Sequence, residues 1–350
     1  MPNDVLTRAI DAVASGHDLS AEQAQEVLAE IMAGEAGEAQ TAAFLIALRA
    51  KGETVEELTG LARTMRALAI PVEVERSDLL DTAGTGGGVP TFNVSTTAAF
   101  VAAGAGCCVA KHGNRSATSR SGSADLLEAL GARIDLDPGG VARCIDDVGF
   151  GFMFAPAHHQ AMRHVVPVRK ALGVRTIFNF LGPLTNPAGA TRQLIGVVDP
   201  AYMQRIAGAL ERLGARHALV VSGTDGLDEL SICAETRVIE VTEEGTRVYT
   251  VSPEDVGLER GRHEDVLGGS PEENAAITRA VLEGEPGPRR ALVAFNAGAA
   301  LMVAGWASTL DEGVRLAEQT LDSGAALQSM ESFLSKTREL APEEVGDRAR

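Results

Sequence analysis

Residues 79–88 read LLDTAGTGGG, a short apolar run that leads directly into a loop with four glycines in five residues. Such a run, bounded by glycines, predicts a buried strand. A helix is expected from about Ser95, and a second strand over residues 107–110. Strand, loop and helix in this order are typical of α/β proteins.

The same alternation continues along most of the chain. We expect further strands at Ile134 and over residues 150–154, 194–198, 218–221 and 238–241, with helices over residues 123–130 and 141–148. Strands separated by helices favour parallel pairing, so the predicted fold class is α/β with a mixed, largely parallel sheet. Active sites of such sheets lie in loops at the carboxyl ends of strands, which makes these loops the candidate functional segments.

The first 70 residues carry helical signals and no strand signal. Ser20 and Thr54 each begin a capping box, because a glutamine or glutamate follows three residues later. Apolar residues between them recur at helical spacing. We therefore expect a small N-terminal helical domain over residues 1–70, joined by helices from about residues 160–190, beside an α/β domain over residues 71–350.

Composition excludes several classes of protein. Of 350 residues, 45% are apolar and 23% are charged, which is ordinary for a globular chain. The formal net charge of -17 disfavours binding to nucleic acid or to an anionic membrane. The first residues lack the apolar core of a signal peptide, and no apolar run is long enough to span a bilayer. We expect a soluble, cytoplasmic protein.

The four cysteines are Cys107, Cys108, Cys144 and Cys233. None forms a C-x-x-C pair, so neither a zinc ribbon nor a thiol redox motif is indicated. We interpret them as small buried side chains in a reducing compartment. The paired histidines at 158 and 159 have no acid or cysteine nearby at ligand spacing, so a zinc site there is disfavoured.

The glycine-rich loop is a candidate anion site. With no Cβ in the way, the backbone N–H groups of residues 84–88 can converge on a phosphate. The loop is not a dinucleotide fingerprint, since Val89 stands where the last glycine would be, and no Gly-Lys-Ser/Thr follows as in a P-loop. Ser95 and Thr96 are expected as N-caps of the next helix, whose N-terminus also favours phosphate.

A polar loop follows the second strand. Residues 111–123 read KHGNRSATSRSGS and combine three cations with five hydroxyls. Such a segment is too polar for a hydrophobic core and is suited to binding phosphate. Residues 225–231, DGLDELS, place carboxylates in a glycine-containing loop after another strand. Such hard oxygen ligands suit magnesium shared with a substrate phosphate, although a solvated acidic turn is the simpler reading of this segment alone.

The motifs together resemble one known family. In chain order, GTGG, N-x-S-T, KHGNR, LEALG, VRKALGVRT, FNFLGPLTNP and GLDE resemble the anthranilate phosphoribosyltransferases. The likeness runs from the N-terminal helices to about Val241, and more loosely to the C-terminus. The KHGNR segment distinguishes the chain from the pyrimidine nucleoside phosphorylases of the same fold, which would use inorganic phosphate.

The resemblance implies a reaction and a set of residues. The reaction is transfer of the phosphoribosyl group of phosphoribosyl pyrophosphate to the amine of anthranilate, in tryptophan biosynthesis. The resemblance assigns substrate binding to Gly84, Gly87, Gly88, Thr91, Asn93, Val94, Ser95, Thr96, Lys111, His112, Gly113, Asn114, Arg115, Ser119, Ser123, His159 and Arg169. Within that set, His112, Asn114, His159 and Arg169 are expected to border anthranilate, with Arg169 facing its carboxylate.

The resemblance also implies a metal and an assembly. It assigns Mg²⁺ to Ser95, Asp228 and Glu229, and it implies a homodimer formed through the helical domain. No catalytic acid or base is assigned. A non-enzymatic, nucleic-acid-binding relative is the second alternative, which the net charge and the intact Asp228–Glu229 pair disfavour.

Two positions depart from the family pattern. The family usually reads GTGGD, whereas Gly88 stands where the aspartate would be, and the spacing from Gly88 to Asn93 is slightly short. Thr118 stands where a serine is common, which is a mild change. Because an aspartate beside pyrophosphate would repel it unless a cation intervened, we expect Gly88 to lessen the dependence of substrate binding on magnesium.

Overall fold

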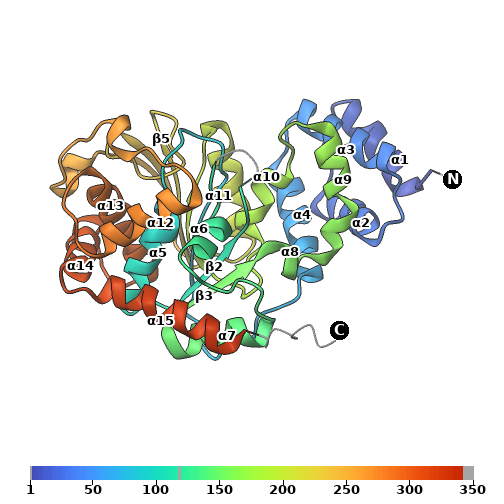
Figure 1. Cartoon of the computed structure of the whole chain (residues 1–350). Coiled ribbons are helices and arrows are strands. Elements are labelled where there is room, and N and C mark those ends of the chain that lie inside the picture. Colours follow the sequence, from blue (N-terminus) through green and yellow to red (C-terminus); the bar gives the residue numbers. More distant parts are fainter. Residues whose placement is uncertain (1, 117–119, 342–350) are drawn as a thin grey trace, which may run out of the picture.

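The computed structural model describes residues 2–116 and 120–341. These residues form two lobes (Figure 1), a small helical one that carries the N-terminus and a larger one built on a sheet. The sheet has seven strands in the order β3-β2-β1-β4-β5-β6-β7. The predicted fold class, α/β with a helical domain beside it, is confirmed.

The helical lobe begins with four helices, as the capping signals predict. They are α1 (Asp4–Ala14), α2 (Ala21–Ala33), α3 (Glu38–Lys51) and α4 (Val55–Leu68). Ser20 and Thr54 both complete capping boxes, and Gly34 ends α2 in the left-handed conformation. Helices α2 and α4 cross closely at Gly60, where a Cβ would lie 2.1 Å from the Ala21 carbonyl oxygen. Only glycine allows that approach.

Five strands of the sheet are parallel and two are antiparallel. The parallel strands are β1 (Leu80–Gly84), β2 (Val109–Gly113), β3 (Phe150–Phe154), β4 (Arg192–Gly196) and β5 (His217–Gly223). The antiparallel pair is β6 (Thr236–Thr242) and β7 (Gly245–Val251). The sequence did not reveal β7, because most of its side chains are exposed and no apolar alternation marks it.

The sheet separates two hydrophobic cores. Along β5, Leu219 and Val221 face the core shared with α5 (Val94–Gly104) and α13 (Pro288–Ala304), whereas Ala218 and Val220 face the core shared with α11 (Met203–Arg212). Successive strand residues point to opposite faces, so both faces are covered. Helix α4 packs on α11, and this contact makes the helical lobe continuous with the second core.

Helices around the sheet complete the larger lobe. They are α6 (Ser123–Ala129), α7 (Pro138–Val148), α12 (Pro271–Leu282), α14 (Leu310–Asp322) and α15 (Ala325–Leu340), with short 3₁₀ turns η3 (Pro200–Tyr202), η4 (Pro253–Val256) and η5 (His263–Val266). In the described part of the chain, no helix is both long and apolar enough to cross a bilayer.

The strand predicted at Ile134 is wrong. Ala132, Ile134 and Leu136 are buried in alternation with more exposed neighbours, which is the pattern that suggested a strand. The segment nevertheless pairs with no strand. The Arg133 N–H donates instead to the Thr337 hydroxyl of α15, 3.2 Å away, so the segment with this period of two packs on a helix.

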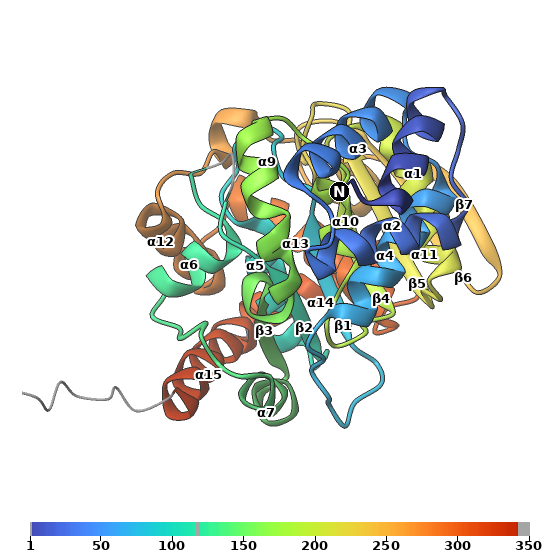
Figure 2. The same ribbon diagram turned by 90° about the vertical axis from the view of Figure 1, so that its right-hand side faces the viewer.

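The chain returns to the helical lobe after β3. It forms α8 (Ala155–His158), η1 (Gln160–His164), α9 (Val166–Leu172), α10 (Phe178–Leu181) and η2 (Gly182–Leu184). Helix α9 packs on α3, η1 packs on α2, and α10 packs on α4. Figure 2 shows α9 running alongside the N-terminal helices, in front of the sheet. The domain boundary that we propose at residue 70 lies between the end of α4 and the start of β1.

Candidate active site

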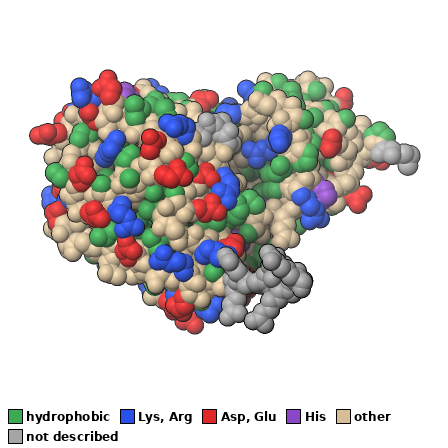
Figure 3. Space-filling view, viewed as in Figure 1, with side chains coloured by type: hydrophobic (Ala, Val, Ile, Leu, Met, Phe, Trp, Pro, Cys, Tyr) green, Lys and Arg blue, Asp and Glu red, His purple; other side chains and the backbone are tan. Residues whose placement is uncertain are grey.

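The motif-bearing loops leave neighbouring strands at the same edge of the sheet. Gly84 at the end of β1 lies opposite Gly196 of β4, which in turn lies opposite Val221 of β5. The glycine-rich loop follows β1, the DGLDELS loop follows β5, and the KHG residues occupy β2 beside β1. Parallel pairing therefore brings three sequence-distant segments together. Figure 3 shows a hollow between the two lobes on one face of the molecule.

The glycine-rich loop contacts the acidic loop directly. The Gly86 N–H donates to Asp228 Oδ2 at 2.8 Å. Gly86 and Gly87 have φ of 64° and 87°, in the left-handed region that glycine adopts without strain. At Gly84 a Cβ would lie 2.6 Å from the Asp228 carboxylate. The glycines are thus required both by the backbone conformation and by this close approach.

Asp228 and Glu229 are an unfavourable pair of carboxylates on their own. Burial raises the pKa of Asp228, and the Gly86 N–H opposes that rise. Burial and the charge of Asp228 hold the pKa of Glu229 well above its usual range, while Lys111 and a hydrogen bond from the Ser95 backbone lower it. The three residues expected to bind metal, Ser95, Asp228 and Glu229, are therefore brought together by the fold.

The N-terminus of α5 differs from its prediction. Asn93, not Ser95 or Thr96, is the N-cap residue, and its side chain makes no capping bond. Its amide instead donates to the Ser121 carbonyl at 3.2 Å and accepts from the Asn274 amide at 2.9 Å. Asn93 is thus the link between α5, the 111–123 loop and α12, a role that sequence spacing alone does not reveal.

Lys111 lies at the centre of the cluster and is almost fully buried. Its ammonium donates to the carbonyl and the hydroxyl oxygens of Thr82 and approaches Ser95 Oγ at 3.4 Å. Burial lowers the pKa of Lys111 to about 8, although Asp81 and Glu229 favour the charged form. The ammonium lies between Thr82 of β1 and Ser95 at the N-terminus of α5.

Two buried histidines face each other beside this cluster. The rings of His112 and His159 lie 5.1 Å apart. His112 Nδ1 is 3.2 Å from the Gly182 carbonyl, which makes that nitrogen the proton-bearing one. The Nε2 atoms of both histidines are buried and have no hydrogen-bond partner among the described residues. Burial lowers the pKa of His112 to about 3 and that of His159 to about 4, so both rings are neutral.

Arg169 is half-buried on α9, on the helical side of the hollow. Its guanidinium lies 5.5 Å from the centre of the Phe178 ring. Among residues 2–116 and 120–341 no carboxylate contributes to its pKa, which burial alone lowers. A half-buried cation without a counter-ion is suited to an anionic ligand.

Several predicted residues play other parts in the structure. Arg115 points away from the loop and forms ion pairs with Asp125 and Glu128 of α6. Asn114 accepts from the Arg115 N–H at 2.7 Å through its side chain. At Gly113, a Cβ would meet Ser123 Oγ at 2.2 Å, so Gly113 and Ser123 pack against each other.

The remaining predicted positions are near the α5 N-terminus or outside the described residues. Thr91 forms an isolated bridge with Leu267, and Val94 is a buried core residue at the start of α5. The Thr96 hydroxyl is buried and unpaired within the part of the chain that the structure describes. Ser119 falls in residues 117–119, which lie outside the described residues.

Position 88 faces the acidic loop. A Cβ on Gly88 would lie 2.6 Å from the Gly226 carbonyl oxygen and 3.3 Å from Asp228 Oδ1. An aspartate at this position therefore cannot be built without displacing the Gly226 backbone. The side chain of that aspartate would start beside Asp228. The absence of its negative charge therefore affects the Asp228–Glu229 pair as much as a bound pyrophosphate.

Comparison with known proteins gives a consistent result. Residues 76–327 match the glycosyl transferase family a/b domain, and residues 7–69 match its helical bundle domain. The anthranilate phosphoribosyltransferase of Symbiobacterium thermophilum is 57% identical over 95% of this chain and 97% of its own length. That of Moorella thermoacetica is 53% identical over 95% and 98%.

The chain belongs to the anthranilate phosphoribosyltransferase family. The crystal structure of the family member from Thermus thermophilus superimposes with a TM-score of 0.89 at 49% identity, covering 94% of this chain and 99% of that one. The Saccharomyces cerevisiae enzyme in complex with PRPP and Mg gives 0.88 at 29% identity, covering 96% and 98%. The chain therefore transfers the phosphoribosyl group of phosphoribosyl pyrophosphate to anthranilate, in tryptophan biosynthesis.

One residue of this anthranilate phosphoribosyltransferase was missed by sequence reasoning. Arg175, between α9 and α10, donates to the Gly86 carbonyl at 2.7 Å and to the Thr85 carbonyl at 3.2 Å. Its own carbonyl accepts from Arg49 of α3 at 2.9 Å. Arg175 thus ties the helical lobe to the glycine-rich loop. It lies within the VRKALGVRT motif, but only the contact itself reveals the role.

We expect Arg175→Ala to raise the KM for phosphoribosyl pyrophosphate by about five- to thirtyfold, with a smaller effect on the KM for anthranilate. Two charge-assisted hydrogen bonds to partly exposed carbonyls contribute about 1–2 kcal/mol. Without them the glycine-rich loop loses its link to the helical lobe. Steady-state kinetics with each substrate varied measures the split. The exposed Arg163→Ala on η1 serves as the control, and equal changes in both KM values would contradict the role.

We expect His112→Asn to make the protein less sensitive to acid. The unfolded chain binds a proton at His112 below about pH 6.5 while the folded one stays neutral, so stability falls as pH falls through this range. Between pH 7 and pH 5 the variant should lose about 2 kcal/mol less unfolding free energy than the parent. Urea unfolding at the two pH values measures this, with the exposed His17→Asn as control. An identical pH dependence in all three proteins would show that His112 is not held neutral.

Proposed function

We propose that the glycine-rich loop and the N-terminus of α5 bind the pyrophosphate of the donor substrate, and that Asp228 and Glu229 would hold magnesium beside it. The observation that carries this proposal is the hydrogen bond from the Gly86 N–H to Asp228. This bond joins the loop proposed to bind the anion to the pair proposed to bind the cation, which supports a site for a magnesium-bound pyrophosphate ester.

The residues present fit magnesium. Two adjacent carboxylates with raised pKa values, beside the Ser95 backbone, offer only hard oxygen ligands. When bound, the ion would offset negative charge that develops on the departing pyrophosphate. The Saccharomyces cerevisiae relative was solved with PRPP and Mg, which supports the same ion here.

We propose that anthranilate binds between the lobes, against His112, His159 and Arg169. The Arg169 guanidinium supplies a cation for the carboxylate of the acceptor. His112 donates through Nδ1, which leaves its buried Nε2 as an acceptor for an amine N–H. Because both rings are neutral, they do not repel the positive charge that develops on the sugar. A relative from Saccharomyces cerevisiae was solved with 4-fluoroanthranilate, which supports an acceptor site in this fold.

The chain's own contribution to catalysis is mainly electrostatic. Cleavage of the ribose–pyrophosphate bond leaves negative charge on the leaving group, which Lys111 and the loop N–H groups offset. The two lobes hold donor and acceptor next to each other, so the amine attacks without a bimolecular encounter. His112 Nε2 is placed to orient the amine lone pair, and we assign no general base.

We also propose a homodimer formed through the helical lobe, and a cytoplasmic location. Ile46 of α3 and Val166 of α9 are apolar and exposed, at 38% and 51%, on helices that pack on each other. Exposed apolar side chains on neighbouring helices suit a subunit contact. Light scattering of the purified chain tests the dimer, and a monomer at micromolar concentration would contradict it. Fractionation of cells tests the location, and recovery with the membranes would contradict it.

We expect Asp228→Asn and Glu229→Gln each to raise the magnesium concentration needed for half-maximal activity by about tenfold or more, because each removes one hard ligand, worth about 1.4 kcal/mol. The loss of anthranilate fluorescence with phosphoribosyl pyrophosphate and varied magnesium measures this. The exposed Glu235→Gln, near β6, is the matched control. Magnesium dependence equal to that of the parent in both variants would show that the pair does not hold the ion.

We expect Arg169→Ala to raise the KM for anthranilate by about ten- to a hundredfold and to leave the KM for phosphoribosyl pyrophosphate within about twofold. The loss of a charge-assisted bond to a carboxylate costs about 1.5–3 kcal/mol. Lys170→Ala, the exposed neighbour on α9, controls for a general loss of positive charge. If both substrates are affected equally by Arg169→Ala, the residue supports the fold rather than the acceptor.

A further inference from the structure

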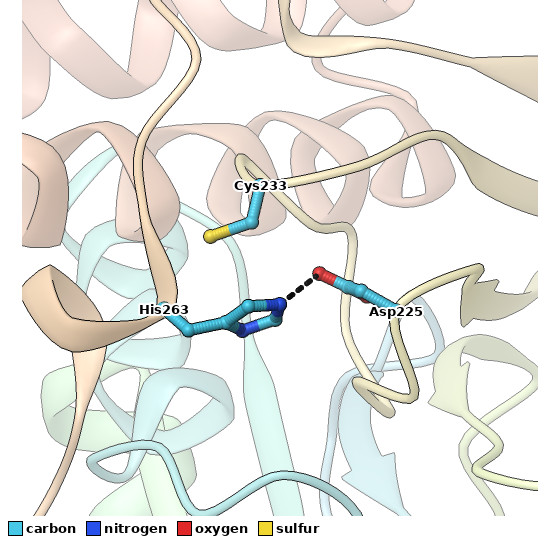
Figure 4. Close-up of side chains that lie close together, drawn as sticks. All are labelled: Asp225, Cys233 and His263. Atoms are coloured by element: carbon cyan, nitrogen blue, oxygen red, sulfur yellow. Dashed lines mark ion pairs between the residues drawn. The ribbon is translucent and has the colours of Figure 1, made fainter.

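Three potential metal ligands of different chemistry meet beside the β5–β6 connection. Asp225 follows β5, Cys233 precedes β6, and His263 begins η5, so three separate segments contribute (Figure 4). Their ligand atoms all lie within 4.8 Å of one another, and His263 Nε2 is 3.5 Å from Asp225 Oδ2. Among the described residues, this is the one group of three or more such side chains close enough to hold a metal ion.

The carboxylate of this cluster is held in place. Asp225 is 9% exposed and accepts a hydrogen bond from the Ser231 hydroxyl at 2.6 Å. Ser231 Oγ in turn accepts from the backbone N–H groups of Cys233 and Ala234, at 2.9 Å and 3.2 Å. A ligand fixed by a hydrogen-bonded neighbour is the usual support of a protein metal site. One buried hydroxyl therefore positions the Asp225 carboxylate and the backbone of Cys233.

We propose that Asp225, Cys233 and His263 form a binding site for zinc, separate from the magnesium site. Thiolate, imidazole and carboxylate together select zinc over magnesium, which prefers oxygen alone. Ligand atoms around a tetrahedral zinc lie about 3.3–3.6 Å apart. The Asp225–His263 distance of 3.5 Å already meets this, and the sulfur lies within 4.8 Å of both atoms. His263 is 43% exposed, so solvent has access to the fourth position.

The electrostatics of the cluster favour a cation. Burial raises the pKa of the Cys233 thiol, and the neighbouring Asp225 and Asp265 carboxylates raise it further, while Ser231 and Arg260 act in the opposite direction. Arg260 is itself paired with Glu254. A divalent ion reverses the balance, because it stabilises the thiolate while the thiol proton passes to solvent.

A metal at this site would stabilise two segments that border the candidate active site. The loop between Asp225 and Cys233 carries Asp228 and Glu229. The η5 turn that carries His263 leads to Leu267, which bridges Thr91 on the strand-to-helix loop before α5. A metal at this site joins these two segments, so it fixes the outer wall of the proposed magnesium site without supplying a ligand to it.

Cobalt(II) titration of the full-length, untagged protein tests the proposal, after dialysis against a chelator and with magnesium in excess. Cobalt replaces zinc in such sites, and only a thiolate ligand gives a sulfur-to-cobalt charge-transfer band. We expect one cobalt per chain with that band, displaced by zinc. Cys233→Ser and His263→Asn should each lose tight binding, and Cys233→Ser should lose the band altogether.

The matched control is His217→Asn, because His217 also pairs with a carboxylate, Glu240 at 2.9 Å, with no thiol in the group. It should keep the band. Circular dichroism establishes that each variant is folded, and zinc should raise the Tm of the parent and of His217→Asn but not of the other two. No charge-transfer band in the parent, or a band that survives in Cys233→Ser, would overturn the proposal. Because no substrate is used, failure here leaves the transferase function unaffected.

Discussion

The hydrogen bond between the Gly86 N–H and the Asp228 carboxylate is the contact on which the rest of the site depends. The bond requires that residue 84, at the end of β1, has no Cβ and that residue 86 adopts a positive φ. It also requires that the acidic loop leaves β5 at the same edge of the sheet. The parallel pairing of β1 with β4 and of β4 with β5 brings the two loops to that edge. The N–H that we propose as an anion ligand and the carboxylate that we propose as a cation ligand thus satisfy each other in this structure.

The helical lobe matters because the acceptor residues do not come from the sheet alone. Arg169 lies on α9, which packs on α3, whereas His112 lies on β2. The second hydrophobic core runs from the N-terminal helices through α4 and α11 to the sheet, so the two halves of the site share one packed interior. Arg175 adds a polar tie across the same boundary. The proposed acceptor residues are therefore joined to the sheet by a continuous buried core.

Much of this could be read from the sequence, and the failures have physical causes. Capping boxes at Ser20 and Thr54 predicted helix starts because capping is a local interaction. The strand predicted at Ile134 was wrong because alternating burial also occurs in a segment that packs on a helix. The predicted N-cap at Ser95 was wrong because Asn93 occupies that position. The Asn93 amide makes no capping bond and instead bonds to Ser121 and Asn274. Long-range partners of this kind leave no local signal.

The candidate site residues also divide into those with a local sequence signal and those whose partners are distant along the chain. Glycines and carboxylates in loops were identifiable because few structural roles require them together. Arg115 resembled a phosphate ligand in sequence, yet two carboxylates on α6 engage it in the structure. Arg175 and the Cys233–His263 cluster were invisible because their partners are distant along the chain. Composition tells which side chains could bind an anion or a metal. Only the fold tells which of them are already engaged with another residue, and a cation that pairs with no carboxylate among the described residues, such as Arg169, is the one we propose for a substrate.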